Sequence, residues 1–439
     1  MNRIYNVLFI LTVLLAFSCE KAEQKGAGDD VRIVWEEPKA VKYGKYTVTG
    51  GYPRVHRLND GRLMLSYSVD NNAVAQFSKN DGETWGAPQI IMGHYDVERK
   101  PWGKARMTAA VPDFAQLSAN HPHHPNRIIY ACNYRPRQLT DKGTLGEKGW
   151  TTVAAYTISI SVSDDNGAPD SWTEKKHIYL SKIWSENKKV GCWEPFVLEL
   201  PDGTVQIYFA DETPYYGGTD SNKRDWHNIS VIESKDGGDT WGQVRIVSQN
   251  SECRDGMPVV AMHNDMLLLA IESTDFKGQR LHPIVINNPI TNNWSSTVGK
   301  GDPHRFEPFQ VSLGSRVKYS GAPYIITTDN YIVYSYQISD WYTPPSNLTQ
   351  SQQLALCKQY NEEEHATLEV QVCSKSEVDD KGYFRTMRSP SRPLKVDQTT
   401  GKENALWNSL CDLGDDKVMA VSQYNGKVYT VTGKIVEKK

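Results

Sequence analysis

Short runs of apolar or alternating residues recur along the whole chain. Typical runs lie at 62–67 (RLMLSY), 204–209 (TVQIYF), 266–271 (MLLLAI) and 331–336 (YIVYSY). Runs of this length that follow clusters of Asn, Asp, Gly or Pro predict β-strands. Helical periodicity is convincing only over residues 351–360. The pattern therefore predicts an all-β chain of many short strands.

An octapeptide interrupts this pattern more than once. It is SKDGGDTW at 234–241 and SKNDGETW at 78–85, and a looser copy starts at Ser163 (SDDNG) and resumes at Ser171-Trp172. In such a segment Ser and Asp side chains bond nearby backbone N–H groups, and Gly takes a turn position with positive φ. The Trp then anchors the next strand in the core. We interpret the octapeptide as a hairpin-turn staple, which carries structure and no chemistry.

The repeat resembles the Asp-box (S-x-D-x-G-x-T-W) of sialidase-type β-propellers. Its copies are too far apart for a solenoid repeat and suit a large β-unit. At ~60–70 residues per blade, a chain of this length holds about six blades. We therefore expect residues 31–439 to form one six-bladed β-propeller of four-stranded antiparallel blades, closed by the strand at 428–432 beside the first blade. Two stacked β-sandwiches are the alternative, which the repeats disfavour.

The first 30 residues are expected to lie outside this domain. An apolar run at 7–17 follows a short basic start and is too short to span a bilayer comfortably. It ends in LAFSC at 15–19, which resembles a bacterial lipobox except for Ala16 three residues before the Cys. The resemblance implies a signal peptide at 1–19, lipidation of Cys19 and a flexible tether at 20–30. We expect an exported lipoprotein of the bacterial outer membrane, on its periplasmic or outer face, with plain secretion as the alternative.

Composition narrows the class of partner. With 49 basic and 52 acidic residues the chain is close to neutral, which argues against nucleic acid held by bulk charge. The cysteines show no C-x-x-C or Cys/His ligand spacing, so we expect no metal site, and disulfide pairing stays open. No cofactor is implied. We expect a monomer that meets the membrane only through its lipid anchor and acts on an oligosaccharide or glycan.

Two glutamates stand at positions that suit chemistry. Glu194 lies between a Trp and a Pro directly before an apolar strand, and such crowded surroundings raise the pKa of a carboxyl, as a general acid requires. Glu272 ends the apolar run at 266–271, where a carboxylate would emerge at the rim of the central channel. For both residues a strand-end Glu paired with an arginine is the alternative.

Several segments together resemble the exo-arabinanase family of sialidase-fold glycosidases. They are YPR at 52–54, WEPFVLELPDG at 193–203, DE at 211–212, GMPVVA at 256–261, APY at 322–324 and SYQ at 335–337, besides the Asp-box. In that family two glutamates carry out retaining hydrolysis, which implies Glu194 as acid/base and Glu272 as nucleophile. Retention requires carboxyls ~5–5.5 Å apart, whereas inversion requires ~6.5–9.5 Å.

Further residues are expected to contact the substrate. Arg54 resembles the first-blade arginine with which sialidases grip a carboxylate, as a guanidinium can do bidentately. The others are Arg135, Asp211, Arg254, Tyr324 and Tyr336, and the two tyrosines are expected to stack a sugar or to hydrogen-bond Glu272. For Arg54 the alternative is a surface arginine on an edge strand, and for Arg135, Asp211, Tyr324 and Tyr336 a packing or turn role stays open.

The expected function is an exo-acting retaining glycoside hydrolase that removes terminal sugars from a polysaccharide or glycan, with an arabinan-like oligosaccharide favoured. An exo-sialidase is the alternative enzyme, and it requires three arginines that converge on one point. The segment LWNSL at 406–410 stands where sialidases carry their last arginine signature. A sugar-binding propeller without catalysis, or a purely structural propeller, is the alternative from another class.

Overall fold

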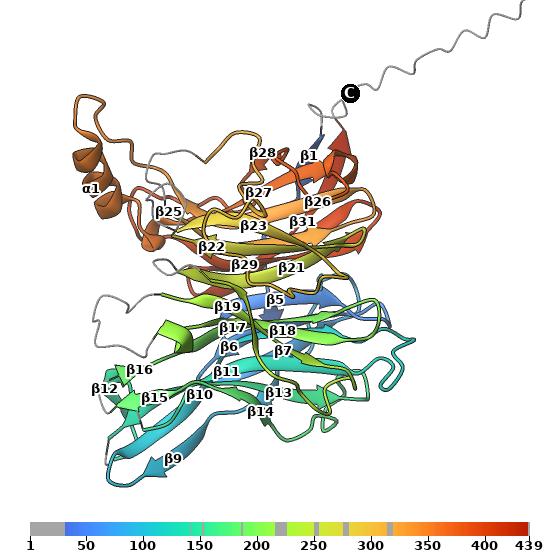
Figure 1. Cartoon of the computed structure of the whole chain (residues 1–439), viewed down its shortest axis with the longest axis vertical. Coiled ribbons are helices and arrows are strands. Elements are labelled where there is room, and N and C mark those ends of the chain that lie inside the picture. The colour runs from blue at the N-terminus through green and yellow to red at the C-terminus, as the bar shows by residue number, and fades with distance from the viewer. Residues whose placement is uncertain are drawn as a thin grey trace, which may run out of the picture.

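The structure is a computed structural model that describes residues 31–140, 142–151, 153–185, 188–215, 226–249, 254–274, 281–313 and 319–437. Six antiparallel sheets form the blades of a β-propeller, as expected (Figure 1). The expected signal peptide, Cys19 and the tether lie outside the described residues, so these expectations stay predictions. No helix in the described ranges is long and apolar enough to cross a membrane.

Each blade has a core of four strands. From the axis outward they are β5 (Gly51–Arg57), β6 (Leu63–Val69), β7 (Asn72–Ser78) and β8 (Gln89–Met92) in blade 1; β10 (Gly103–Gln116), β11 (Ile128–Leu139), β13 (Thr157–Ser163) and β14 (Lys176–Leu180) in blade 2; β17 (Cys192–Glu199), β18 (Val205–Asp211), β19 (Asn228–Ser234) and β20 (Arg245–Ser248) in blade 3; β21 (Asp255–His263), β22 (Met266–Ser273), β23 (His282–Pro289) and β24 (Arg305–Phe306) in blade 4; β25 (Tyr319–Thr327), β26 (Tyr331–Ser339), β27 (Thr367–Ser374) and β28 (Arg388–Ser391) in blade 5; and β29 (Ala405–Gly414), β30 (Lys417–Tyr424), β31 (Lys427–Glu437) and β1 (Val31–Trp35) in blade 6.

Smaller elements decorate this frame. Blade 2 gains β9 (Tyr95–Arg99) and β12 (Leu145–Trp150), and blade 6 gains β2 (Lys39–Ala40). Two small hairpins lie in the connections between strands: β3–β4 (Lys42–Tyr43, Tyr46–Thr47) and β15–β16 (Ile183–Ser185, Lys188–Lys189). The connections also contain three short 3₁₀ helices, η1 (Thr213–Tyr215), η4 (Glu363–His365) and η5 (Lys375–Glu377). The helix α1 (Gln350–Tyr360) matches the expected helical segment, and Thr349 caps it.

The ring closes through the first described strand. β1 pairs antiparallel with β31, from Val31 opposite Glu437 to Trp35 opposite Gly433. The C-terminal strand lies in blade 6, which packs beside blade 1 as expected, and it receives the first described strand as the outer strand of this blade. Hydrogen bonds between the two ends of the chain hold the propeller closed.

Every innermost strand carries a β-bulge at the same place. In β17, Trp193 pairs with Ala210 and Phe196 with Tyr208, so two residues, Glu194 and Pro195, face one residue of β18. The first bulge residue has positive φ, between 46° and 55°, in all six blades. These residues are Tyr52, Val111, Glu194, Met257, Ala322 and Trp407. A proline, which has no N–H for the ladder, follows in five of the six.

The bulge residues meet at the axis of the propeller. Tyr52, Val111, Met257 and Ala322, from four different blades, form one buried cluster against which Trp407 packs. We call the six positions the bulge ring. Glu194 is its acidic member, so the fold itself places this carboxyl at the axis.

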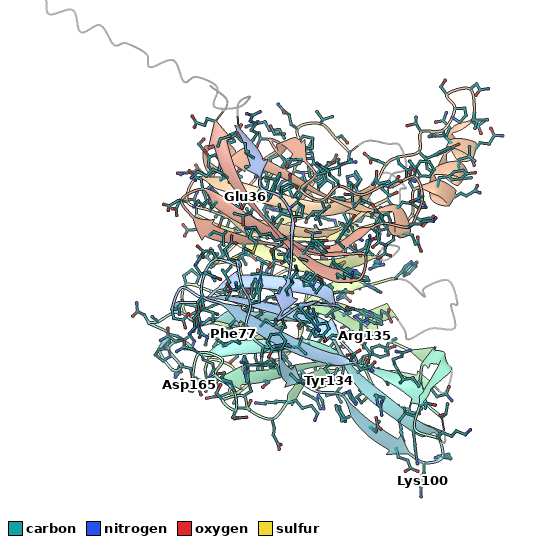
Figure 2. All side chains as sticks on the ribbon, turned by 180° about the vertical axis from the view of Figure 1, so that it is seen from behind. Glu36, Phe77, Lys100, Tyr134, Arg135 and Asp165 are labelled. Atoms are coloured by element: carbon teal, nitrogen blue, oxygen red, sulfur yellow. The ribbon has the colours of Figure 1, made fainter. Side chains whose placement is uncertain are left out.

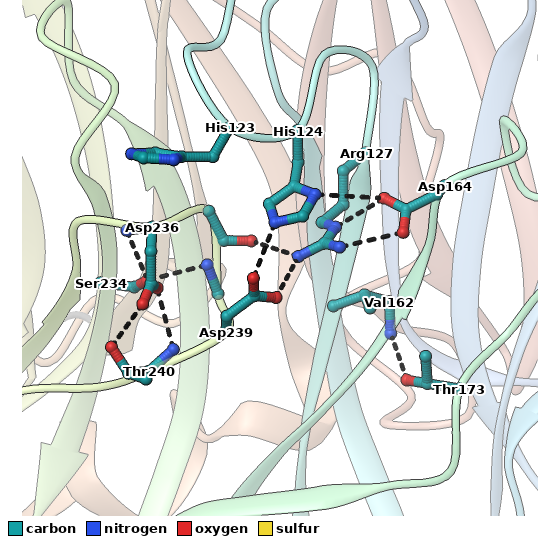
Figure 3. Close-up of polar contacts among 12 residues, drawn as sticks. His123, His124, Arg127, Val162, Asp164, Thr173, Ser234, Asp236, Asp239 and Thr240 are labelled. Atoms are coloured by element: carbon teal, nitrogen blue, oxygen red, sulfur yellow. Dashed lines mark hydrogen bonds and ion pairs between the residues drawn. The ribbon is translucent and has the colours of Figure 1, made fainter.

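The octapeptides form turns between the third and fourth strands of blades 1 to 3. In the copy of blade 3, the Gly238 N–H donates to Ser234 Oγ and the Thr240 N–H to Asp236 Oδ1, each over 2.8 Å (Figure 3). Arg127 donates to both Asp164 and Asp239, which ties the turns of blades 2 and 3 together (Figure 3). These turns lie at the end of the blades opposite to Glu194 and Glu272, because strand direction alternates within a blade.

Figure 2 marks the two ends of blade 2. Asp165 belongs to the third octapeptide copy, and Arg135 lies toward the side from which α1 projects. The blade interiors are packed with aliphatic and aromatic side chains, and the five cysteines of the described ranges are buried. The candidate chemistry is therefore confined to one end of the axis, and the structural turns to the other.

Candidate active site

Glu194 is an acid in poorly solvated surroundings. It stands at the bulge of β17, and its Oε2 is buried without a hydrogen-bond partner among the described residues. Burial raises the pKa of Glu194, the charges of Arg254 and Arg135 offset part of this rise, and Glu272 adds to it. The Glu194 carboxyl therefore keeps its proton to a higher pH than an exposed glutamate does.

Glu272 is held firmly from two sides. It is almost fully buried near the end of β22, and its Oε1 accepts a hydrogen bond from Arg254 Nη2 over 2.5 Å. Its Oε2 accepts one from the Ala322 N–H of the next blade over 2.9 Å. A Cβ added to Gly321 would lie 2.6 Å from Oε2, and one added to Gly256 would lie 3.2 Å from Oε1. Two backbone segments without side chains thus enclose the carboxylate.

The strand register shows that Glu272 also has a structural role. Glu272 pairs with Gly256 just before the bulge of its blade, as Gln337 pairs with Gly321 in blade 5. Gln337 Oε1 accepts the N–H of the next bulge residue, Trp407, over 3.0 Å, much as Glu272 accepts that of Ala322. One oxygen of Glu272 therefore links two blades, and the other is oriented by Arg254.

Arg135 and Arg254 complete a cluster of two carboxyls and two guanidinium groups. Arg254 directly precedes β21. Burial lowers the pKa of its guanidinium, but the negative charges of Glu272 and Glu194 outweigh burial, so the pKa of Arg254 is raised. Arg135 lies with its guanidinium 5.0 Å from the ring centroid of Trp193, and its Nε donates to Asn133 Oδ1. Burial lowers the pKa of Arg135, and Glu194 is the largest influence that opposes this. The structure thus brings together four of the eight residues predicted to be catalytic or substrate-binding.

Arg54 and the two tyrosines lie elsewhere. Arg54 is buried, donates to the carbonyls of Pro53 and Asn408 over 2.9 Å, and lies 3.7 Å from the ring centroid of Tyr52. These bonds hold its guanidinium within the protein, which differs from the expected grip on a substrate carboxylate. The guanidinium lies between the Tyr52 ring of its own strand and the Asn408 carbonyl of blade 6, directly after the bulge of β5.

Tyr324 and Tyr336 are packed in the propeller core. The Tyr336 hydroxyl donates to Glu369 Oε1 over 2.5 Å and accepts from Gln371 Nε2, so it does not form the expected hydrogen bond to Glu272. Tyr324 contacts Phe196 edge to face. Tyr324 directly follows the bulge of β25, and Tyr336 lies opposite this bulge in β26. Their expected contact with a sugar stays a prediction.

Asp211 and its neighbour Glu212 form hydrogen bonds that hold the residues around Glu194 in place. Asp211 accepts from the Tyr179 hydroxyl and the Thr213 N–H, and burial raises its pKa. Glu212 accepts from the Gly191 N–H (2.6 Å) and from Trp193 Nε1 (3.0 Å), and it pairs with His227 Nε2 (3.0 Å). Burial raises the pKa of Glu212, but the His227 hydrogen bond and charge outweigh it, so the pKa is lowered. Glu212, which the sequence analysis passed over in favour of Asp211, fixes the segment that carries Glu194.

A third carboxyl lies beside the pair. Glu363 in η4 is partly buried, and its pKa is raised by burial first and by Glu272 second. No residue of the acidic run 362–364 was among the expected site residues. No group of three or more His, Cys, Asp or Glu residues within the described ranges is arranged to hold a metal ion. The site thus combines an acid with a raised pKa, Glu194, and an ion-paired carboxylate, Glu272. Glycoside hydrolysis uses two carboxyls that differ in this way.

Comparison with known proteins identifies the fold. No protein-family model and no curated protein matches the chain. It is similar to a protein of unknown function from Dyadobacter fermentans, with 13% identity and a TM-score of 0.59 over 92% of this chain and 99% of that one. It is also similar to the GH93 α-L-arabinofuranosidase of Fusarium graminearum in complex with arabinobiose, with 14% identity and a TM-score of 0.52 over 94% and 98% of the two chains. A Hadza microbial sialidase gives 13% identity and a TM-score of 0.53 over 91% and 68%.

These similarities confirm the expected fold. The chain is a six-bladed β-propeller with the architecture shared by GH93 arabinofuranosidases and sialidases. At such identities they speak to the fold alone.

Proposed function

We propose that the protein is an exo-acting retaining glycoside hydrolase that removes terminal sugars from an oligosaccharide, with arabinan-like substrates favoured. The observation that carries the proposal is the contrast between two neighbouring carboxyls. Glu194 has a raised pKa and an unpartnered buried oxygen, whereas Glu272 is paired with Arg254. The fold shared with an arabinofuranosidase and with sialidases supports it.

In this proposal Glu194 donates its proton to the glycosidic oxygen while a Glu272 oxygen attacks the anomeric carbon. The bond to the leaving sugar breaks, and a covalent ester links the terminal sugar to Glu272. Glu194, now a carboxylate stabilised by the nearby charges of Arg135 and Arg254, takes a proton from water, and the resulting hydroxide attacks the anomeric carbon. The ester breaks, the sugar leaves with its original configuration, and both carboxyls return to their starting states.

The test uses Glu194→Gln and Glu272→Gln. Glutamine suits the Glu272 position because Gln337 fills the equivalent position of blade 5 with the same inter-blade hydrogen bond, so the variant should keep its fold. We expect turnover of arabinan oligosaccharides to fall about 10²–10⁴-fold in Glu194→Gln. An aryl arabinoside, whose leaving group needs no proton, should rescue the bond-breaking step in Glu194→Gln but not in Glu272→Gln.

Glu364→Gln, which alters an exposed glutamate, is the control. NMR of the first product should show a retained anomer. Wild-type turnover in either Gln variant would contradict the assignment, and an inverted anomer would contradict the covalent step.

An exo-sialidase is the second candidate, because sialidases share the fold. The bonds of Arg54 to backbone carbonyls and of Arg254 to Glu272 disfavour it, since a substrate carboxylate would have to compete for these guanidinium groups. Parallel assays on sialosides separate the two candidates. A propeller that only binds sugars would bind one of these ligands without turnover.

We also propose that the chain is exported and lipid-anchored through Cys19, on the lipobox resemblance at 15–19. In a bacterial host, Cys19→Ala should move the protein from the membrane fraction to the soluble fraction. An unchanged distribution would contradict the anchor.

A further inference from the structure

A cavity of about 790 Å³ lies between blades 4 and 5. Its walls come from the connection between β23 and β24 and from the connection between β27 and β28. Both connections join a third strand to a fourth, so they lie at the end of the propeller opposite to Glu272. In blades 1 to 3 the octapeptides occupy this connection, whereas neither of these two segments contains one. The volume is that of a small-molecule site, for which ~300–1,000 Å³ is usual.

The two walls are joined by a buried amide. Asn287, which is 2% exposed, donates from Nδ2 to the Lys381 carbonyl over 2.8 Å, and its Oδ1 is 2.6 Å from His304 Nδ1. In the β27–β28 connection, Asp379 Oδ1 accepts the N–H groups of Lys381 and Tyr383 over 2.9 and 2.8 Å. The cavity is thus formed by segments that hydrogen bonds already hold in place.

Polar groups around the cavity keep capacity for further hydrogen bonds. Because the Asn287 amide nitrogen faces a carbonyl, the Asn287 oxygen must accept from His304 Nδ1, which leaves Nε2 of the neutral ring as an acceptor. Within the described ranges, His304 Nε2 and Asp379 Oδ2 form no hydrogen bond. Two acceptors suited to hydroxyl groups therefore line the cavity.

The charged side chains favour an anionic ligand. Three cations and two carboxylates line the cavity beside Arg305: Lys300, Lys381 and Arg385, with Asp302 and Asp379. Arg305 is already compensated by Asp255, to which it donates two hydrogen bonds over 2.8 and 2.9 Å. Lys381 and Arg385 are exposed and form no ion pair with a described residue. These two cations are thus available to a carboxylate from outside.

A saccharide that carries a carboxylate matches all of these groups. Lys381 and Arg385 can bind the carboxylate, and an arginine can do so bidentately. His304 and Asp379 can accept hydrogen bonds from hydroxyls. The partly buried ring of Tyr383, 4.4 Å from that of Phe306, offers apolar surface to a sugar ring. A uronic acid unit combines a carboxylate, hydroxyls and an apolar ring face in one ligand.

We propose that this cavity is a second, non-catalytic binding site, which takes an acidic saccharide and binds its carboxylate at Lys381 and Arg385. The site goes beyond the proposed function, since it lies at the other end of the propeller and shares no residue with the candidate active site. An acidic glycan bound there holds the protein in place while Glu194 and Glu272 stay accessible.

Calorimetry with trigalacturonate on the full chain tests this site. We expect Lys381→Met and Arg385→Met each to lower the affinity about 10- to 100-fold, as for a lost hydrogen bond between charged groups. Both side chains are exposed, so the variants should keep their fold. Lys235→Met, which removes an exposed lysine from the octapeptide of blade 3, should stay within about twofold of the wild type.

Several results would overturn the proposal. They are a wild type that does not bind trigalacturonate at millimolar concentration, equal affinities of Lys381→Met and Lys235→Met, and neutral maltotriose or inorganic phosphate that binds as tightly as trigalacturonate. A loss of trigalacturonate affinity in Glu272→Gln would place the ligand in the candidate active site and would also overturn it. Turnover of arabinan oligosaccharides should be unchanged in Lys381→Met, and an inactive wild type that binds trigalacturonate as expected would contradict only the catalytic proposal.

Discussion

Gly321 and Glu272 come from different blades, yet a Cβ on Gly321 would stand 2.6 Å from the Glu272 Oε2. The next residue, Ala322, donates its N–H to the same oxygen. The position of the candidate nucleophile is therefore set by the backbone of blade 5, and not only by its own strand β22.

Gly321→Ala should displace the Glu272 carboxylate without removing it. The new methyl group meets an oxygen that Ala322 and Arg254 hold in place, so either the carboxylate or the β25 backbone must shift. A misplacement approaching 1 Å costs about 10²-fold in rate, and we expect a fall in kcat of that order. Gly299→Ala, where the nearest atom lies 3.9 Å away, is the matched control. Normal kcat in a folded Gly321→Ala protein would show that Glu272 does not need this position.

The pH profile should report Glu194 directly. Activity requires the protonated carboxyl in the first step, so kcat/KM should fall as pH rises through the raised pKa of Glu194. Arg135 stabilises the carboxylate form, and its removal should raise the pKa of Glu194 further. In Arg135→Met the alkaline limb should therefore move to higher pH, whatever the loss in maximal rate. Arg106→Met, which breaks a surface pair with Asp96, should leave the limb in place. A limb that moves to lower pH, or not at all, would contradict the role of Glu194.

Arg127→Met should weaken the propeller without touching the site. Its guanidinium is buried, with a side chain 6% exposed, whereas Asp164 and Asp239 are 60% and 53% exposed. Solvent screening on the acidic side limits the expected loss to about 1–2 kcal/mol at neutral pH. Urea unfolding measures it, and kcat should be unchanged.

At low pH the difference in stability between the wild type and Arg127→Met should disappear. Hydrogen bonds from Arg127 lower the pKa of Asp164 and of Asp239 below their unfolded values. This contribution is complete above the unfolded pKa, about 3.9, and is lost as pH falls through the folded-state values. The unfolding midpoints of wild type and variant should therefore converge at low pH. A constant gap between them would mean that Arg127 acts through its hydrogen bond to the Gly237 carbonyl or through packing, and not through the two carboxylates.

The fold was predictable because its signals are local. The octapeptide at 234–241 forms its turn through hydrogen bonds between its own side chains and its own backbone. Its structure can therefore be predicted from the local sequence alone. Glu194 and Glu272 could be singled out for the same reason, since each stands at the border of an apolar strand. The pairing of β31 with β1 could not be predicted in this way, because it joins two strands at opposite ends of the described chain.

The remaining site residues depend on distant contacts. Arg54 is held by the Asn408 carbonyl of another blade, and Glu272 is held by Arg254 and by the Ala322 N–H of the next blade. One signal was nevertheless present in the sequence. The dipeptides Tyr52-Pro53, Val111-Pro112, Glu194-Pro195, Met257-Pro258 and Ala322-Pro323 stand once in each of blades 1 to 5 and mark five of the six positions of the bulge ring.

The bulge ring has a consequence for how this scaffold acquires chemistry. At each of its six positions the backbone is shaped by strand pairing and by the residue that follows, so residues as unlike as Ala322, Trp407 and Glu194 share one conformation. The axis thus has six positions of one backbone conformation, and among them only the position in blade 3 carries an acid. The backbone that holds an apolar side chain in the neighbouring blades holds the Glu194 carboxyl as well, so an acid at the axis needs no blade of its own design.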